Sequence, residues 1–235
     1  MEILRSVISL KKSAYKRALC ALFSVFLALT MVFPGEVALA ASAPSNVARF
    51  SMTGCSASTV SLSWSKVKGA SGYRIRRYDS KSKKWKTVLT ATKGSAIKGT
   101  VKRLSPATTY KLQIHAYKKA GKKTLYSKKA KTLTVATKPA KVTLQSAKAS
   151  GAKITVSWKK VAASGYQVIY ARNKQFKNGE SILVGGSNKT ATYYAPYSGT
   201  YYVHLRPYKN LNGKNYYGSW SNSKTVKVNI PKQAY

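Results

Sequence analysis

The chain has 235 residues, of which 43 are Lys or Arg and only four are Asp or Glu, so its formal net charge at pH 7 is +39. From residue 41 onward, 38 basic residues face just two acids, Asp79 and Glu180. A catalytic pair of carboxylates is therefore excluded unless the two halves of the chain fold back on one another. So positive a chain favours polyanions such as nucleic acid, anionic lipid or anionic polysaccharide, without selecting among them.

The amino terminus predicts an export signal. Five basic residues within 1–17 precede an uncharged, mainly apolar stretch at 18–33, and "PGEVALA" then ends in an Ala-x-Ala pattern. This order is typical of a secretory signal peptide, here 1–40, with cleavage after Ala40. A membrane anchor is the alternative, but the apolar stretch is short for a span and the cleavage pattern follows it at once. We therefore expect a secreted, extracellular protein with no transmembrane segment after cleavage.

Cysteine usage excludes a disulfide-built scaffold. Once residues 1–40 are removed, Cys55 is the one thiol left. Its setting, "MTGCSAS", predicts an inert turn residue rather than a nucleophile.

An internal repeat organises the rest of the chain. The stretch "VSLSWSKVKGASGYRI" at 60–75 matches "ITVSWKKVAASGYQVI" at 154–169. Further on, "YKLQIHAY" at 110–117 matches "YYVHLRPY" at 201–208. Repeats at a fixed spacing indicate copies of one structural unit, so we predict two copies of one domain.

The spacing of the repeat places the domain boundaries. We predict domain 1 at 44–138, domain 2 at 139–230 and a short tail at 231–235. The boundary lies in "ATKPAKV" at 136–142, where Pro139 interrupts the last strand pattern of the first copy.

Each copy alternates apolar and polar residues with a period of two. In 110–117, the inward set is Tyr110, Leu112, Ile114 and Ala116, and no stretch after residue 40 sustains helical spacing. Six or seven such short strands in each copy predict antiparallel β-sandwiches. The aromatic residues that the alternation assigns to the two cores are Trp64, Tyr73, Tyr110, Trp158, Tyr166 and Tyr201.

Together these residues resemble the fibronectin type III domain. The resemblance is carried by the early Trp of each copy, by the "GY" pairs at 72–73 and 165–166, and by "LSPATTYKLQIHAY", which is similar to the family's Leu-x-Pro-x-Thr-x-Tyr run. It implies an all-β protein of two tandem immunoglobulin-like (fibronectin type III) antiparallel β-sandwiches after a signal peptide. It also implies that Tyr110 is the corner tyrosine, whose hydroxyl bonds back to the loop between the sheets.

The second copy departs from this pattern at "APYSGTY", but its "GSWS" at 218–221 resembles the last strand of bacterial and receptor members. With "SGYQVIYARNKQF", this resembles modules of Gram-positive surface proteins and implies a secreted bacterial type. The family consists mainly of adhesive, spacer and receptor modules, so the resemblance implies no chemistry.

No constellation for catalysis, metal binding or cofactor binding is found in the sequence. His115 and His204 fall on the outer faces of matched strands with no further ligand nearby, which predicts solvated residues. The Ser-x-x-Lys pairs fall in predicted strand ends or turns, and no Gly-rich phosphate loop is present. We therefore predict a protein that is not an enzyme and needs no cofactor.

Aromatic residues outside the predicted cores could form a ligand surface. The sequence "NYYGSW" at 215–220 places Tyr216, Tyr217 and Trp220 in a predicted exposed cluster suited to stacking on sugars. Arg206 is expected to stack on Trp220 as a structural cation–π contact. In the first copy the matching residues are His115 and Lys129, so that stack is expected to be absent there. Further outward aromatic residues are expected at Tyr117, Tyr202 and Tyr208.

Basic loops carry the remaining functional signal. The first copy has 23 Lys and Arg against Asp79, and the second has 15 against Glu180. The richest loops, at 79–86 and 117–129, are on strands that are expected to lie near one another. The polyanion-binding candidates are Lys81, Lys83, Lys84, Lys86, Lys118, Lys119, Lys122 and Lys123.

The predicted partner is an anionic cell-wall polymer or extracellular glycan, held noncovalently by a protein with an adhesive or binding role. Nucleic acid is expected to bind only nonspecifically, through charge. Two alternatives remain: a carbohydrate-binding module that uses the aromatic residues of domain 2, and a passive structural spacer.

The strand at 72–79 leaves one ambiguity. Arg77 occupies the place of the inward Tyr170 of the second copy, and Tyr78 follows it. Either a bulge returns Tyr78 to the core, or Arg77 reaches the rim with its stem buried. Trp85 is expected to return to the core after the turn.

Overall fold

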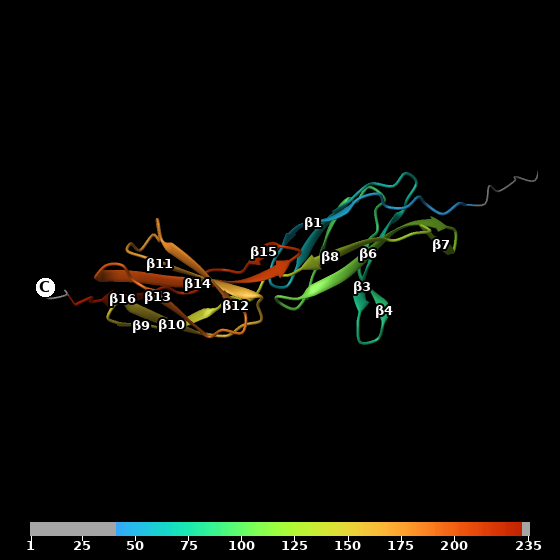
Figure 1. Cartoon of the computed structure of the whole chain (residues 1–235). Helices are drawn as coiled ribbons and strands as arrows, with labels where there is room; N and C mark the ends of the chain where they lie inside the picture. Colours follow the sequence, from blue (N-terminus) through green and yellow to red (C-terminus); the bar gives the residue numbers. More distant parts are fainter. Residues whose placement is uncertain (1–40, 232–235) are drawn as a thin grey trace, which may run out of the picture. The chain divides into compact units, whose positions relative to one another are not determined.

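A computed structural model describes residues 41–231, and the predicted signal peptide at 1–40 lies outside this range. All sixteen regular elements within it are β-strands. The described residues include no helix long and apolar enough to cross a membrane. The chain is thus all-β, as the alternation predicts, and its strands divide into two separate sandwiches (Figure 1).

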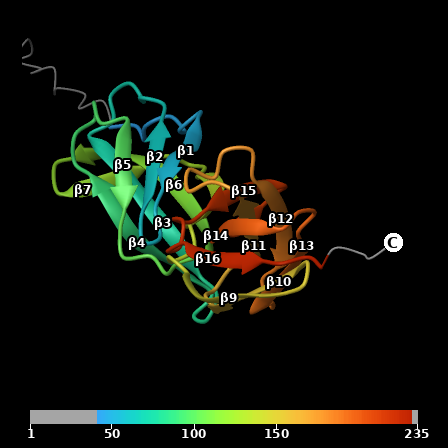
Figure 2. The same cartoon turned by 90° about the vertical axis from the view of Figure 1, so that its left-hand side faces the viewer.

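The first sandwich packs a three-stranded sheet on a five-stranded one. Its strands are β1 (Phe50–Cys55), β2 (Val60–Trp64), β3 (Gly72–Asp79), β4 (Lys84–Ala91), β5 (Lys98–Val101), β6 (Thr109–Ala120), β7 (Lys123–Tyr126) and β8 (Lys131–Ala136). One sheet has the order β1-β2-β5, with β2 in the middle (Figure 2), and the other has the order β4-β3-β6-β7. The long strand β6 pairs with β8 along its first half and with β7 along its second half.

The second sandwich repeats this topology. Its strands are β9 (Thr143–Ser150), β10 (Lys153–Lys159), β11 (Gly165–Ala171), β12 (Glu180–Gly185), β13 (Thr190–Tyr194), β14 (Gly199–Leu211), β15 (Lys214–Tyr217) and β16 (Lys224–Val228). The sheet orders are β13-β10-β9 and β12-β11-β14-β15, and β16 pairs with the first half of β14. All pairings in both sandwiches are antiparallel.

A tryptophan and a tyrosine meet at the centre of each core. The ring centroids of Trp64 and Tyr73 are 5.5 Å apart, and those of Trp158 and Tyr166 are 5.1 Å apart. Each tyrosine hydroxyl accepts a hydrogen bond from a backbone amide, so the polar end of the ring is satisfied inside the sandwich. These contacts join the sheets, because Trp comes from β2 or β10 while Tyr comes from β3 or β11.

The "GY" pairs have a steric cause. A side chain at Gly72 would collide with the carbonyl of Ala91 and with the ring of Tyr117, which lies across the glycine. Gly165 has the same relation to Val184 and Tyr208. This packing also corrects one expectation: Tyr117 was predicted to point outward into solvent, but it is only 4% exposed because it fills the space over Gly72.

A β-bulge in β4 resolves the ambiguity at Arg77. The pairing shifts between Ile75 and Arg76, whose partners are Leu89 and Thr87, so one residue of β4 is skipped. Arg77 keeps the inward position, with its guanidinium 5.4 Å from the centre of the Tyr110 ring. The bulge turns Trp85 to the outer face, where it packs against Tyr78. The expectation that Trp85 returns to the core is therefore wrong, because the extra residue reverses the alternation.

Substitution of Gly72 by Ala tests the close approach of Tyr117. We expect Gly72→Ala to lower the free energy of unfolding by about 1–3 kcal/mol, since the added methyl group overpacks a contact with no room to relax. Gly54→Ala is the matched control, because a Cβ at Gly54 meets nothing within 4 Å. Chemical denaturation measures both changes, and equal stability of the two variants would contradict the steric explanation.

Candidate anion-binding surface

The lysine candidates of the first sandwich divide into two groups. Lys81, Lys83 and Lys84 lie at the β3–β4 turn, and Lys119, Lys122 and Lys123 lie at the β6–β7 turn. Because β3 and β6 are antiparallel, with Gly72 opposite Tyr117, these turns lie at opposite ends of the sheet. The strand rise puts them about 35 Å apart. The strands that carry these lysines are adjacent, as expected, but the two turns themselves are far apart.

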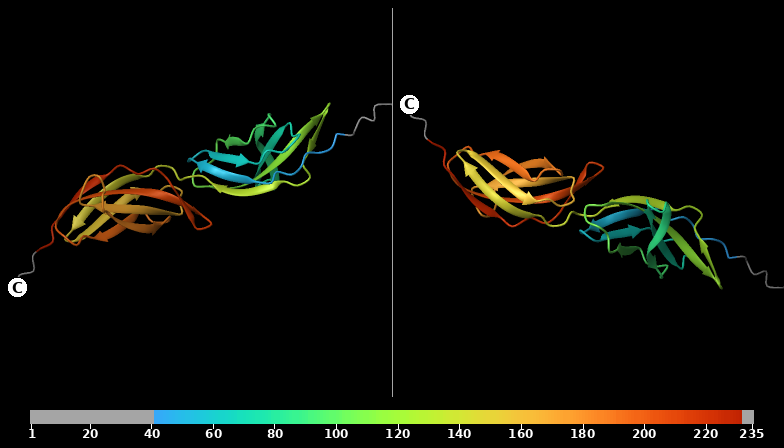
Figure 3. Two further views of the ribbon diagram at one scale, coloured as in Figure 1. Left: turned by 90° about the horizontal axis from the view of Figure 1, so that it is seen from above. Right: turned by 90° about the horizontal axis from the view of Figure 1, so that it is seen from below.

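The β6–β7 hairpin extends beyond the rest of the first sandwich (Figure 3), and its three lysines are exposed. Lys118 differs from them, because its side chain is half-buried on β6. The turn itself depends on Gly121, which adopts a left-handed backbone conformation with a φ of 57°. The hairpin thus presents positive charge at its tip only.

Asp79 organises the other lysine-rich turn. One oxygen of its carboxylate accepts hydrogen bonds from the backbone amides of Lys81 and Ser82, at 3.1 and 3.4 Å. The other oxygen forms an ion pair with Lys86. The hydrogen bond from Lys86 lowers the pKa of Asp79 to about 2, so the carboxylate stays charged at neutral pH. Lys86 is therefore already paired, unlike the other lysines of this turn.

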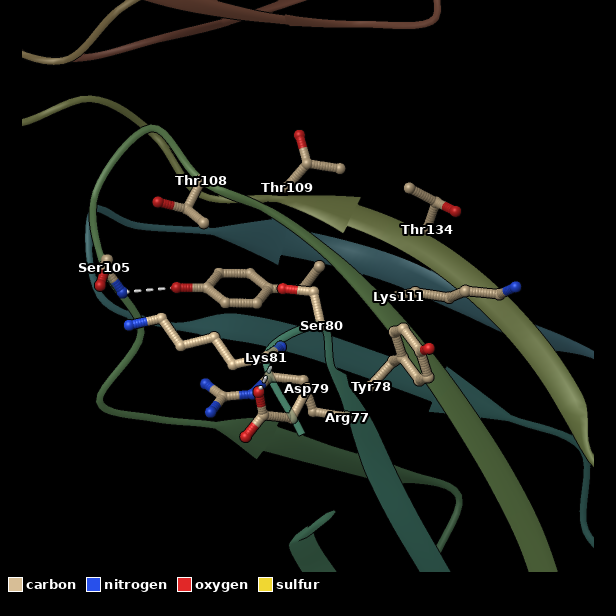
Figure 4. Close-up of a pocket in the computed structure, with 11 residues that line it drawn as sticks. Arg77, Tyr78, Asp79, Ser80, Lys81, Ser105, Thr108, Thr109, Lys111 and Thr134 are labelled. Atoms are coloured by element: carbon tan, nitrogen blue, oxygen red, sulfur yellow. Dashed lines mark hydrogen bonds between the residues drawn. The ribbon is translucent and has the colours of Figure 1, made fainter. Parts of the chain in front are cut away.

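A hollow of about 520 Å³ lies beside this turn (Figure 4). Its lining includes three cationic side chains, Arg77, Lys81 and Lys111, which come from β3, the turn and β6. Hydroxyl groups surround them, and the volume falls within the range of about 300–1,000 Å³ found for small-molecule sites. The lining residues are Arg77, Tyr78, Asp79, Ser80, Lys81, Ser105, Thr108, Thr109, Tyr110, Lys111 and Thr134.

Tyr110 fixes the floor of this hollow. Its hydroxyl accepts a hydrogen bond of 2.7 Å from the amide of Ser105, which is the corner contact that the family resemblance implies. The ring then supports the guanidinium of Arg77. Three cations line the hollow, and the lysine-rich stretches of the sequence point to only one of them, Lys81. Arg77 follows Arg76 within a strand and Lys111 is an isolated lysine of another strand, so only the pairing of β3 with β6 brings them together.

In the second sandwich, the predicted aromatic cluster forms a closed stack. The guanidinium of Arg206 lies 3.9 Å from the centre of the Tyr217 ring and 4.3 Å from that of Trp220. The opposite face of Trp220 is covered by His204, with ring centroids 3.9 Å apart and planes 9° apart. Both faces of Trp220 are therefore occupied by the protein itself. Tyr216 is not part of the stack and contacts Lys214 instead.

His204 is a central member of this stack rather than a solvated strand residue. Phe176, from the loop between β11 and β12, covers its second face with ring centroids 3.5 Å apart. Burial lowers the pKa of His204 to about 4, and the nearby charge of Arg206 acts in the same direction. The expectation that His204 is solvated is wrong, because sequence reasoning could not place the Phe176 loop over the strand.

The first sandwich also has an arginine stacked on an aromatic ring, but the arginine comes from the other strand of the cross-strand pair. No Arg–Trp contact is found at His115 and Lys129, but Arg74 lies over the ring of Tyr126 at 4.9 Å. Arg74 pairs with His115 across the sheet, just as Gln167 pairs with Arg206 in the second sandwich. Each copy therefore places one guanidinium over the tyrosine of the matching strand, β7 or β15, and the arginine comes from β3 in one copy and from β14 in the other.

Other chemistry has little support within residues 41–231. No three His, Cys, Asp or Glu side chains of this part gather so that they could hold a metal ion. Cys55 is half-buried at the end of β1, not in a turn as predicted, and burial raises the pKa of its thiol. A raised pKa leaves less of the reactive thiolate at neutral pH.

The strand order and the inter-sheet core define each half of the chain as an immunoglobulin-like β-sandwich. The family model of the fibronectin type III domain matches residues 42–132. Residues 42–132 therefore form a fibronectin type III domain, and a second sandwich of the same topology follows it. Domains of this family are generally non-enzymatic binding or spacer modules.

Solved structures of similar organisation are distant in sequence. A two-domain fibronectin type III segment of chicken tenascin is 18% identical, with 80% of this chain and 100% of that segment covered and a TM-score of 0.46. The alpha chain of the chicken interferon gamma receptor is 15% identical, with 80% and 99% covered and a TM-score of 0.37. No curated protein matches the chain in sequence. The family assignment therefore rests on the model match and on the strand topology.

The stack in the second sandwich makes stability depend on Trp220. We expect Trp220→Ala to destabilise this sandwich by about 2–3 kcal/mol, because it removes contacts with both Arg206 and His204. Tyr194→Ala is the control, since Tyr194 is 68% exposed and has no such contacts. Thermal unfolding measures both variants, and an unchanged transition in Trp220→Ala would contradict a stabilising stack.

Acid should weaken the second sandwich through His204. The pKa of His204 is lower in the folded protein than in the unfolded chain, where it is about 6.5, so the unfolded chain binds the proton more strongly. Stability is then complete above about pH 6.5, falls as the pH drops toward 4, and changes no further below that value. After allowance for solvent screening, we expect a loss of about 1–2 kcal/mol.

The variant His204→Phe isolates this effect, because it keeps an aromatic ring in the stack and removes the titrating group. Urea unfolding at pH 7 and pH 4 should show a smaller acid loss in His204→Phe than in the unaltered protein. Equal losses would assign the acid sensitivity to other groups.

Proposed function

We propose that the protein is a non-enzymatic, exported binding protein whose first sandwich holds an anionic cell-wall polymer or extracellular glycan. One observation carries the proposal: the ion pair between Lys86 and Asp79 is the only salt bridge among the described residues. Nearly all the positive charge of the chain therefore lacks an acidic partner within the fold. Such charge repels itself, and an anionic polymer would relieve the repulsion.

The arrangement of the charge supports an extended ligand. The lysines of the two turns lie at the two ends of one sheet of the first sandwich, about 35 Å apart by the strand rise. The cationic hollow lies at the end that carries the β3–β4 turn. A polymer that follows the sheet could contact both turns, whereas a small anion could reach only one.

The aromatic alternative has less support. A sugar-stacking platform needs open ring faces, but those of Trp220 are covered by Arg206 and His204. Tyr217 lies under the same guanidinium and against the ring of Tyr208. A carbohydrate would have to displace contacts that stabilise the second sandwich.

Export is part of the proposal and rests on the sequence of residues 1–40, which precedes the described range. The bacterial type rests likewise on sequence resemblance. The proposed retention at the cell surface is electrostatic and would weaken with salt.

Binding to purified cell walls over a salt series tests the function. Two triple variants remove equal charge from the two turns: Lys81→Gln, Lys83→Gln and Lys84→Gln, or Lys119→Gln, Lys122→Gln and Lys123→Gln. We expect each to weaken binding and to flatten the plot of log affinity against log salt by roughly one unit per contacting charge lost.

The matched control removes three exposed lysines from the second sandwich: Lys148→Gln, Lys153→Gln and Lys189→Gln. It should have a smaller effect than either triple variant of the first sandwich. Equal effects of all three would show diffuse attraction without a preferred surface. No binding of the unaltered protein even at low salt would leave the role of a passive spacer.

A further inference from the structure

From the hollow beside Tyr110 we infer a specific subsite for one anionic sugar residue, with Arg77 as the group that recognises the anion. This inference deepens the proposed function and rests on it, because it names the part of an anionic polymer that the first sandwich would select. The lysine turns would supply general attraction, and the hollow would supply selectivity.

Arg77 has the features of a recognition residue. It occupies an inward strand position at the rim of the sandwich, where the equivalent residue of the second copy is the buried Tyr170. Its guanidinium rests over the Tyr110 ring and forms no salt bridge within the described part of the chain. A guanidinium held in this way can donate two parallel hydrogen bonds to a carboxylate or phosphate at little entropic cost.

The rest of the hollow is held firmly as well. Tyr110 is fixed by its hydrogen bond from Ser105, and the turn that carries Lys81 is fixed by the carboxylate of Asp79. Asp79 is itself neutralised by Lys86, so it opposes an incoming anion only weakly. Lys81 and Lys111 add positive charge from separate elements. The site is thus preorganised by contacts that exist without the ligand.

The lining favours a sugar over a nucleotide base. The hydroxyl groups of Ser80, Thr109 and Thr134 line the hollow, and sugars present hydroxyl groups of their own. A base would need an open aromatic face, but Tyr110 is covered by Arg77 and Tyr78 packs against Trp85. An acidic sugar offers both an anion for Arg77 and hydroxyls for the lining.

Titration of the purified protein with a hexasaccharide of alternating glucuronate and N-acetylglucosamine tests this inference. The salt concentration is about 0.3 M, so that diffuse attraction is screened. Amide shifts in two-dimensional NMR should change at Ser80, Ser105 and Thr109, and a neutral hexasaccharide of N-acetylglucosamine should give none. Arg77→Gln should raise the Kd about tenfold or more, the loss expected for a hydrogen bond to a charged group.

Lys98→Gln is the charge-matched control, since Lys98 is exposed on β5 in the other sheet and does not line the hollow. It should change the Kd less than twofold. Arg77→Lys keeps the charge and loses the planar fork, so a Kd between those of the unaltered protein and Arg77→Gln supports recognition by geometry. Thermal unfolding of each variant verifies that the fold persists.

Two further ligands identify the chemistry. Glucose 1-phosphate that shifts the same amides supports the subsite and shows that a phosphate can replace the carboxylate. An oligothymidylate of equal charge that shifts them at lower concentration would overturn the choice of a sugar. Equal losses in Arg77→Gln and Lys98→Gln would overturn the subsite itself, while the binding of cell walls at low salt would still stand on its own measurement.

Discussion

The contact between a tryptophan of one sheet and a tyrosine of the other is the interaction on which each sandwich depends. Aromatic side chains of this size each bury about 150–250 Å², which contributes several kcal/mol per ring to the stability of the core. Together with the aliphatic residues around it, this contact opposes the mutual repulsion of the surface cations. The two cores are not identical, because the indole of Trp64 donates to the carbonyl of Ala96 at 2.9 Å whereas that of Trp158 has no partner among the described residues.

Whereas the cores hold the sheets together, the surface carries unbalanced positive charge that repels itself. Each sandwich has one acid, and the acid of the first sandwich both fixes a turn and pairs with a single lysine, so it balances little of the charge. Exposed lysines lie at turns and along strands, where solvent and salt can screen their charge, while several arginines of the strands stack on aromatic rings. Stacking allows a guanidinium to lie against the sheet without an acidic partner, because the ring face attracts the cation.

Much of the fold follows from patterns that the sequence displays directly. The repeat and the two-residue alternation predict two β-sandwiches and place Trp64, Tyr73, Trp158 and Tyr166 in their cores, where the structure also has them. Tyr110 is placed at the corner by resemblance. These features are predictable because they depend on local spacing alone.

The site depends on features that local spacing does not contain. A single bulge reverses the direction of Trp85, and the antiparallel course of β3 and β6 separates two loops that look equivalent in the sequence. Phe176 reaches His204 from a loop in which its own φ is 55°. A phenylalanine at this position does not predict such a backbone conformation. Arg77 and Lys111 meet only through cross-strand pairing. Functional geometry in this protein is therefore a property of register and loop conformation.

The exchanged arginines constrain how the two copies could have diverged. Arg74 and His115 face each other in one copy, and Gln167 and Arg206 do so in the other. A change at only one position of such a pair would give either two adjacent guanidinium groups, which repel, or none, which leaves the neighbouring tyrosine ring uncovered. The effect of a substitution at either position therefore depends on the residue at the other. The two positions of such a pair are expected to change together.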